Sequence, residues 1–275
     1  MNSIIEFSTE QHTDFLLSVK EVYGYDFTLY STASLQRRLR RYMTNKKLDT
    51  VDILKDSILS DKQNFDEFLI EITVNVTEMF RDPGFFRELR SKVAPQLNTY
   101  PHVRVWDAGC STGEEVYSLA ILFKEEGMLK KTRIYATDIN TKVLNEAMEG
   151  IFSMAYLKDY SKNYINAGGH TSLSDFYYAK YNSAIMNEDL KTNITFSSHN
   201  LVSDGAFNEF NLIVCRNVLI YFQRELQEKV IGTFLESLPI FGYLVLGNKE
   251  SLSTSRYRKN FEVIDGKEKI YRRIA

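Results

Sequence analysis

The residues best suited to chemistry stand where short apolar runs of the sequence end. The first such run leads into the segment from Asp107 to Gly113, which contains two glycines. A glycine turn between a strand and a helix lets a ligand approach the backbone closely. Because the segment lacks both Gly-x-Gly-x-x-Gly and the Lys-Ser/Thr pair of phosphate-binding loops, we expect a nucleotide-type ligand without a phosphate chain. The alternative is a plain turn with a capping box that pairs Ser111 or Thr112 with Glu114 or Glu115.

A carboxylate stands at the end of the next apolar run. Asp138 follows residues 133–137. A carboxylate in this position can accept hydrogen bonds from both hydroxyl groups of a ribose, which suggests an adenosine-like ligand. An N-cap for the helix that follows would explain Asp138 equally well.

Two further apolar runs end in asparagine. Asn200 and Leu201 follow residues 194–196, and Asn217 follows residues 211–215. An asparagine side chain offers donors and an acceptor, which match an adenine edge or the amine and carboxylate of an amino acid. Each asparagine alone is commonly a turn residue. Because four apolar runs all end in residues that could bind a ligand, these residues together favour a single binding site.

A polar connector over residues 73–83 precedes the first of these runs. Its Asp82-Pro83 pair resembles an N-cap followed by the first residue of a helix. Nothing in the composition of the segment explains why it contains the polar residues Asn75, Thr77 and Arg81. A solvated linker is the simplest interpretation.

The elements that would position these groups divide the chain into two parts. Residues 1–95 show helical periodicity, whereas strand-like runs then alternate with helical patterns. This alternation predicts an α/β fold with a mostly parallel sheet that is covered on both faces. We therefore expect a helical domain and linker over residues 1–95 and a second domain over residues 96–275. The predicted strands of the second domain are 103–106, 133–137, 194–196, 211–215 and 242–246.

The second domain departs from simple alternation in two places. The runs 261–264 and 269–274 flank a turn and predict an antiparallel hairpin at the end of the chain. Residues 151–192 fit the alternation poorly and contain the aromatic segment 176–181. We expect an insertion here, with a small β ribbon as one option.

One predicted helix in the first part carries a basic face. Its apolar stripe consists of Leu35, Leu39, Tyr42 and Met43. At about 100° per residue, three arginines point away from this stripe and a fourth lies on its flank; they are Arg37, Arg40, Arg41 and Arg38. No acid occurs between residues 34 and 47. A solvated charged face and a docking surface for an acidic partner are both consistent with this pattern.

Composition excludes several classes of protein. A hydrophobic fraction of 44% with only 4 prolines indicates a packed protein rather than a disordered one. The net charge of -2 removes a global electrostatic argument for nucleic-acid binding. No apolar stretch approaches the ~18 residues of a membrane span, and the start of the chain lacks a basic leader, so we expect neither export nor membrane insertion. Two cysteines indicate a reducing, cytoplasmic setting, and four scattered histidines give no metal-ligand spacing.

The sequence resembles the CheR family of chemotaxis receptor methyltransferases along nearly its whole length. The resemblance rests on residues 75–81, 110–115 with 117–118, 137–139, 200–201 and 215–222. It implies a class I, Rossmann-like fold that binds S-adenosylmethionine (SAM), an all-helical N-terminal domain and a small inserted β subdomain. It also implies methyl esterification of receptor glutamates, with acidic cytoplasmic helices of chemotaxis receptors as partners and S-adenosylhomocysteine as the product.

The resemblance also assigns roles to residues of this chain. Arg81 and Tyr221 would lie beside the methyl group and the incoming carboxylate as orienting catalytic groups. Charge complementarity, rather than the resemblance, makes the basic helix our expected docking surface for an acidic receptor segment, through Arg37, Arg38, Arg40 and Arg41. The SAM contacts would fall on Asn75, Thr77, Arg81, Gly109, Glu114 or Glu115, Asp138, Asn200, Leu201 and Asn217.

The sequence departs from the family pattern in three places. Val116 stands where proline is common, and residues 248–250 replace the frequent His-Ser-Glu, so no role is transferred to that loop. The inserted region matches least well. Docking of a receptor's C-terminal peptide to that region therefore stays open.

The expected reaction agrees with the residues present. A glutamate side chain, with an ordinary pKa near ~4.3, is already ionised at neutral pH and needs no general base to attack a methyl group. The site must supply alignment and exclude water. A methyltransferase of small molecules and a non-catalytic SAM-binding module are the two alternative functions.

Overall fold

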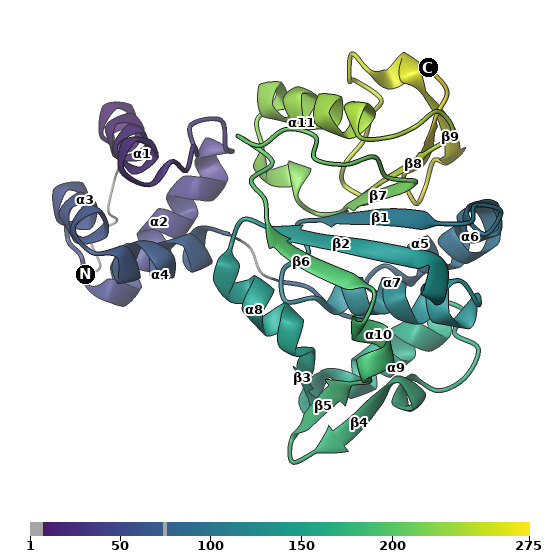
Figure 1. Cartoon of the computed structure of the whole chain (residues 1–275). Coiled ribbons are helices and arrows are strands. Elements are labelled where there is room, and N and C mark those ends of the chain that lie inside the picture. The colour runs from purple at the N-terminus through teal and green to yellow at the C-terminus, as the bar shows by residue number, and fades with distance from the viewer. Residues whose placement is uncertain (1–7, 74–75) are drawn as a thin grey trace. The chain divides into compact units, whose positions relative to one another are not determined.

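The computed structural model describes residues 8–73 and 76–275, and the chain separates into two compact units (Figure 1). The helical unit consists of Met1–Val74 and Ile220–Lys229, and the sheet unit consists of Asn75–Leu219 and Val230–Ala275. Each unit has its own cluster of buried apolar side chains.

The helical unit begins with four helices, in agreement with the helical periodicity of this part of the sequence. They are α1 (Thr9–Tyr23), α2 (Thr32–Lys46), α3 (Val51–Ser60) and α4 (Lys62–Ile72). Side chains of Ser8, Thr50 and Asp61 cap the first turns of α1, α3 and α4. The predicted apolar stripe of α2 is buried in the core of this unit. The sequence periodicity therefore identified the correct face of α2.

A second segment of the chain completes the helical unit. The 3-10 turn η5 (Leu219–Tyr221) leads into α11 (Arg224–Glu236). The backbone N–H of Ser31 donates to the carbonyl of Tyr221 at 2.8 Å, and that of Gln223 donates to the carbonyl of Leu29 at 2.8 Å. Residues 220–229 are thus held by the loop that precedes α2.

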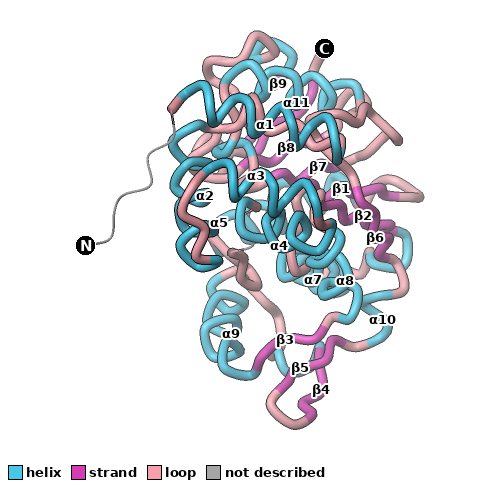
Figure 2. Tube along the Cα trace, turned by 90° about the vertical axis from the view of Figure 1, so that its left-hand side faces the viewer, coloured by secondary structure: helices cyan, strands magenta, loops and turns pink. Residues whose placement is uncertain are grey.

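The sheet unit contains a seven-stranded sheet in the order β6-β2-β1-β7-β8-β10-β9. Figure 2 shows the parallel strands β6, β2, β1, β7 and β8 side by side in this order. The first five strands in this order are parallel, and β10 and β9 are antiparallel. This confirms the predicted α/β fold, the five predicted strands and the closing hairpin. The bounds are β1 (Val103–Ala108), β2 (Thr132–Asp138), β6 (Ile194–Ser198), β7 (Leu212–Cys215), β8 (Tyr243–Leu246), β9 (Phe261–Asp265) and β10 (Ile270–Arg273).

Helices cover both faces of this sheet. Side chains alternate along β1, so Val105 packs in the core with α7, whereas Trp106 meets Phe234 of α11 with ring centroids 5.3 Å apart. Figure 1 shows α7 and α8 on the face opposite α11. The helical elements on this unit are α5 (Pro83–Glu88), the π-helical turn η1 (Leu89–Val93), α6 (Ala94–Leu97), α7 (Glu114–Glu125), η2 (Leu129–Lys131), α8 (Thr141–Glu149) and η6 (Arg258–Asn260).

The compact units divide earlier than the domain boundary that we proposed near residue 95. Residues 83–97 belong to the sheet unit because their apolar side chains enter its core. Phe85, Phe86 and Leu89 are fully buried there. Helical periodicity is the same in both units, so it does not reveal which core a helix joins.

The inserted region forms a separate three-stranded antiparallel sheet, β3-β5-β4, which confirms the β ribbon. Its elements are β3 (Ile151–Ser153), η3 (Met154–Tyr156), α9 (Leu157–Asn166), η4 (Leu173–Phe176), β4 (Tyr177–Lys180), β5 (Ser183–Met186) and α10 (Glu188–Lys191). The sequence did not predict α9. In the described part of the chain, no helix is both long enough and apolar enough to span a membrane.

Candidate functional site

Four parallel strands bring the predicted ligand groups to one edge of the sheet. Strands β1, β2, β6 and β7 run in the same direction. Their last residues are in register, because Ala108 of β1 pairs with Thr137 of β2 and Asp138 of β2 pairs with Ser198 of β6. The loops that follow these strands therefore begin side by side. These loops carry Gly109, Asn200, Leu201 and Asn217, and Asp138 is the last residue of β2.

The turn after β1 requires glycine at position 109. Its φ is 91°, and a Cβ placed on it would lie 2.4 Å from Cγ2 of Val218. The backbone N–H groups of Gly109 and Cys110 both donate to the carbonyl of Thr137, at 2.8 and 3.0 Å. The turn is thus fixed to β2 and keeps its backbone open at the sheet edge.

The capping-box alternative for this turn is wrong. The N-cap of α7 is Gly113, with φ 93°, and no side chain caps the helix. The hydroxyl of Thr112 instead donates to Glu114 at 2.6 Å. The polar residues of the turn are therefore not explained by helix capping.

Asp138 is buried at the tip of β2 and is not an N-cap. Its Oδ2 accepts from the N–H of Ser111 at 2.9 Å and its Oδ1 accepts from that of Asn140 at 3.0 Å. The N-cap of α8 is Asn140, which accepts from Lys142. Burial raises the pKa of Asp138, although its backbone hydrogen bonds oppose the shift. Each carboxylate oxygen can accept a second hydrogen bond, so the two oxygens of Asp138 fit the two donor hydroxyls of a ribose.

The two glutamates at the start of α7 have different partners. Glu114 is buried and accepts from Thr112 and, at 3.4 Å, from the hydroxyl of Tyr160 in α9. Burial raises the pKa of Glu114. Glu115 accepts instead from Nη1 of Arg216. Their fixed orientations give each glutamate a defined place at the sheet edge.

The loops after β6 and β7 are held by acidic side chains. The N–H of Asn200 donates to Asp204 at 2.8 Å, and Asn200 Oδ1 accepts from Val202. Asn217 has φ 61°, and its N–H donates to Glu250 Oε2 at 3.1 Å. Glu250 belongs to the loop to which the sequence assigned no role. The structure shows that this glutamate supports the backbone of Asn217.

The connector before α5 is not a solvated linker, which corrects our simplest interpretation. Met79 and Phe80 are buried, and the N–H of Phe80 donates to Ser118 Oγ at 2.9 Å. Asp82 and Pro83 do begin α5, as predicted. Arg81 directly follows the buried pair, and its Nη1 donates to the carbonyl of Val76 at 3.0 Å, whereas Thr77 is half-buried in the irregular segment before Met79. Asn75 lies outside the described residues.

Arg216 is a site residue that the sequence reasoning missed. It directly follows β7 and its side chain is 2% exposed. It contacts Glu115 and the turn that carries Arg81. The sequence signal that could have identified Arg216 is its position, since it is a charged residue that directly follows an entirely apolar strand.

Tyr221 and the four arginines of the basic helix belong to the helical unit. The guanidinium carbon of Arg38 lies 5.1 Å from the centroid of the Tyr221 ring. Arg41 pairs with Glu71 of α4 at 2.9 Å, and Arg37 is exposed. Acids that relieve the charge of α2 therefore come from another helix. The sequence count between residues 34 and 47 had missed them.

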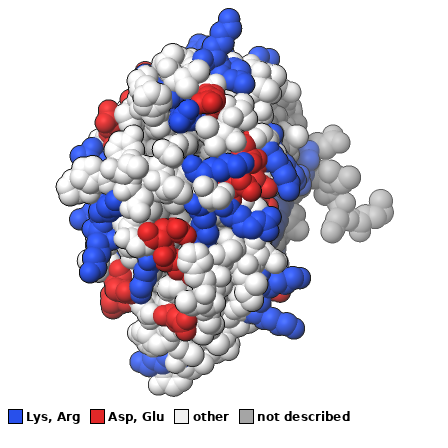
Figure 3. Space-filling view, turned by 90° about the vertical axis from the view of Figure 1, so that its right-hand side faces the viewer, with Lys and Arg blue, Asp and Glu red and all other residues white. Residues whose placement is uncertain are grey.

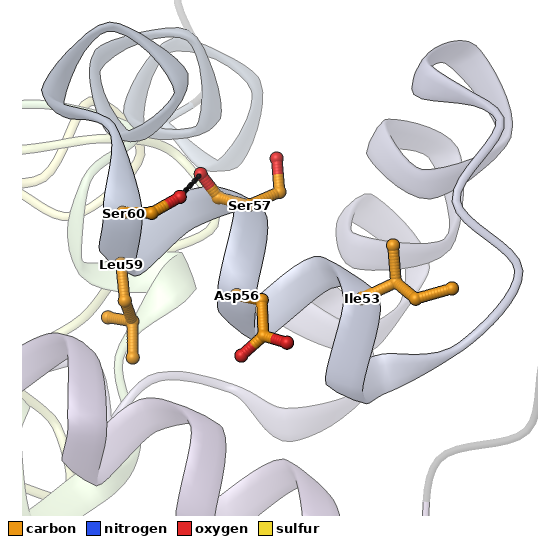
Figure 4. Close-up of a pocket in the computed structure, with 5 residues that line it drawn as sticks. All are labelled: Ile53, Asp56, Ser57, Leu59 and Ser60. Atoms are coloured by element: carbon orange, nitrogen blue, oxygen red, sulfur yellow. Dashed lines mark hydrogen bonds between the residues drawn. The ribbon is translucent and has the colours of Figure 1, made fainter.

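A surface pocket and the distribution of surface charge add no residues to the candidate site at the sheet edge. A pocket on α3, shown in Figure 4, shares no residue with the sheet edge, and there Ser60 donates to the carbonyl of Ser57 at 3.5 Å. Basic and acidic side chains are interspersed on the face shown in Figure 3. No three His, Cys, Asp or Glu residues are grouped to hold a metal ion in residues 8–73 and 76–275. The pocket is lined by Ile53, Asp56, Ser57, Leu59 and Ser60.

Comparison with known proteins agrees with this geometry. Residues 75–270 match the family described as "CheR methyltransferase, SAM binding domain", and residues 13–73 match "CheR methyltransferase, all-alpha domain". The chain is 47% identical to "Putative methyltransferase Cher3" of Pseudomonas putida, over 91% of this chain and 92% of that protein. It is 32% identical to "Chemotaxis protein methyltransferase" of Listeria monocytogenes, over 85% of this chain and 87% of that protein. With both of its parts matched, the chain belongs to the CheR methyltransferase family.

Proposed function

We propose that this protein transfers the methyl group of SAM to glutamate side chains of chemotaxis receptors in the cytoplasm. The products would be glutamate methyl esters and S-adenosylhomocysteine. Relatives named chemotaxis protein methyltransferase support the choice of receptors. The structural observation that carries the proposal is the sheet edge, where a glycine turn lies beside the buried carboxylate of Asp138.

The proposed SAM site uses groups of different chemistry around this edge. Asp138 would hold the ribose hydroxyls, and Gly109 would let the ligand lie against the backbone. Asn200 and Leu201 would contact the adenine. The remaining proposed contacts are Asn75, Thr77, Arg81, Glu114 or Glu115, and Asn217.

The proposed chemistry needs orientation rather than proton transfer. SAM, when bound, supplies an electrophilic methyl group. A glutamate carboxylate is the nucleophile without further activation, so the protein contributes alignment and removal of water. We assign Arg81 and Tyr221 as the groups that orient the carboxylate. No metal is required for this reaction.

The decisive experiment uses SAM with a labelled methyl group and membranes that contain candidate receptors. We expect label on receptor protein, released by mild alkali because a methyl ester is base-labile. Alkali-stable label would contradict the ester, and label on small molecules alone would favour the alternative enzyme. SAM binding without any transfer would indicate a non-catalytic module.

The basic face of α2 is the proposed docking surface for the acidic receptor helices. The double variant Arg37→Glu/Arg41→Glu should lower receptor methylation several-fold at low ionic strength because it reverses the charge that attracts the substrate. The effect should shrink with added salt, since the screening length falls from ~30 Å at 0.01 M to ~8 Å at 0.15 M. SAM affinity, measured by calorimetry, should stay the same.

The matched control for this prediction is Lys55→Glu/Lys62→Glu. It makes the same change in charge on α3 and α4, and each lysine also faces an acid, Asp14 or Asp66. Methylation by the control should equal that of the parent. An equal loss in both double variants would show that net charge matters and that α2 is not a specific docking surface.

A further inference from the structure

Arg216 joins three segments of the sheet unit through one buried side chain. Its Nη1 donates to Glu115 at the start of α7. Its Nη2 donates to Asp82 Oδ2 at 2.6 Å and to the carbonyl of Arg81 at 3.1 Å. The guanidinium carbon also lies 4.5 Å from the ring centroid of Phe85 in α5. The end of β7 is therefore linked both to α7 and to the turn that carries Arg81.

That turn has an unfavourable backbone conformation. Phe80 and Asp82 have φ values of 53° and 55°, which place their backbones in the left-handed region that residues other than glycine rarely adopt. Such a conformation persists only where the surroundings hold it. Asn163 Nδ2 donates to the carbonyl of Met79 at 3.2 Å, and Ser118 and Arg216 hold the following residues.

Arg216 is also the cation of an acidic cluster in which Asp107 is buried and the side chains of Glu115 and Asp82 are 13% and 35% exposed. Burial, followed by the neighbouring Glu115 carboxylate, raises the pKa of Asp107 well above its usual value, and Arg216 opposes this shift. Asp82 and Glu115 both form ion pairs with the arginine. Removing the guanidinium would leave Asp107 and Glu115 poorly solvated without their cation, and Asp82 would lose the group that holds it beside Glu115. The turn bearing Asp82 would then be pushed away from α7.

We propose that Arg216 is a positioning residue, which holds the Met79–Asp82 turn against α7 so that Arg81 is fixed at the sheet edge. This inference rests on the proposed function for the role of Arg81. It does not require Arg216 to contact SAM or the receptor. The contacts of the Arg216 side chain explain why a charged residue is buried at this position, since neither a helix nor a strand requires a charge there.

The test compares two buried arginines of the same unit. Arg216→Lys keeps the charge but loses the planar group that binds two acids and a carbonyl at once. The control is Arg90→Lys, because Arg90 is 8% exposed and likewise pairs with two acids, Glu125 and Glu126. Arg90 contacts none of the proposed site residues in the described part of the chain. Both variants should lose thermal stability.

Only the Arg216 variant should release the turn. We expect the Phe80 amide of Arg216→Lys to exchange its hydrogen about tenfold faster than in the parent, as local opening becomes easier. Receptor methylation should show a kcat lowered about tenfold or more with KM changed less than about threefold, because positioning rather than binding is lost. In Arg90→Lys, Phe80 exchange and kcat should match the parent.

The outcomes separate this inference from the proposed function. Normal Phe80 exchange and normal kcat in folded Arg216→Lys would overturn the positioning role, as would equal effects in both arginine variants. If Arg216→Lys does not fold, Asp82→Asn removes one ion pair at nearly the same shape, and its Phe80 exchange decides in the same way. If the parent methylates no receptor, the proposed function fails and amide exchange alone tests the role of Arg216.

Discussion

Replacing Arg81 by alanine should lower kcat for receptor methylation about 100-fold under saturating SAM and receptor. Loss of one preorganised donor from an active site has a typical cost of this size. The variant should fold normally because, among the residues that the structure describes, the side chain of Arg81 makes one hydrogen bond, to the carbonyl of Val76. One such bond contributes about 1 kcal/mol, which corresponds to a Tm change of roughly 2–4 °C in a chain of this size.

A matched control for Arg81 lies six residues later. Arg87 is exposed and does not belong to the loops of the candidate site. Like Arg81, it uses Nη1 to donate a hydrogen bond to a backbone carbonyl, here that of Asn166 at 2.9 Å. Arg87→Ala should therefore cause a similar small change in Tm and leave kcat unaltered. Full activity of Arg81→Ala, or equal loss in both variants, would remove Arg81 from the proposed catalytic groups.

Replacing Asp138 should weaken S-adenosylhomocysteine binding by about 10- to 150-fold. The carboxylate would give charge-assisted hydrogen bonds to the ribose, and losing them costs roughly 1.5–3 kcal/mol. Asp138→Asn is preferable to alanine because it keeps an acceptor for the N–H of Ser111 or Asn140. Calorimetry at neutral pH measures the change directly. SAM should be weakened by a similar factor.

The pH dependence gives this prediction a second readout. Burial raises the pKa of Asp138, so on acidification the ligand should be lost at a higher pH than an ordinary aspartate would allow. The asparagine variant should lack this titration because it has no proton to gain. If the variant and the parent show the same affinity and the same pH profile, Asp138 is not a ligand of the ribose.

Asp265 provides the structural control for Asp138. Its Oδ1 accepts from the backbone N–H groups of Lys267 and Glu268, at 3.0 and 2.9 Å, in the loop between β9 and β10. Asp265→Asn therefore disturbs a comparable turn away from the ends of the parallel strands. It should lower Tm while both ligands bind as they do to the parent.

The sequence by itself determined the succession of strands in the large sheet and the edge of that sheet at which the predicted ligand groups lie. Apolar runs of strand length, separated by helical patterns, left a parallel sheet as the consistent arrangement. Because parallel strands end at one edge, the positions of Gly109, Asp138 and Asn217 in the fold followed from their places after these runs. The buried stripe of α2 followed in the same way from its helical spacing.

Only the tertiary structure decided which distant groups meet. Arg216 joins Asp82 and Glu115, which are 134 and 101 residues away in sequence, and residues 220–229 join the helical unit although they follow a strand of the sheet. Glu71 of α4 likewise reaches Arg41 of α2. Periodicity records which face of an element is buried, but it holds no information about the partner of a buried charge. That partner is fixed by packing between elements, where a charge removed from water must find opposite charge or hydrogen bonds.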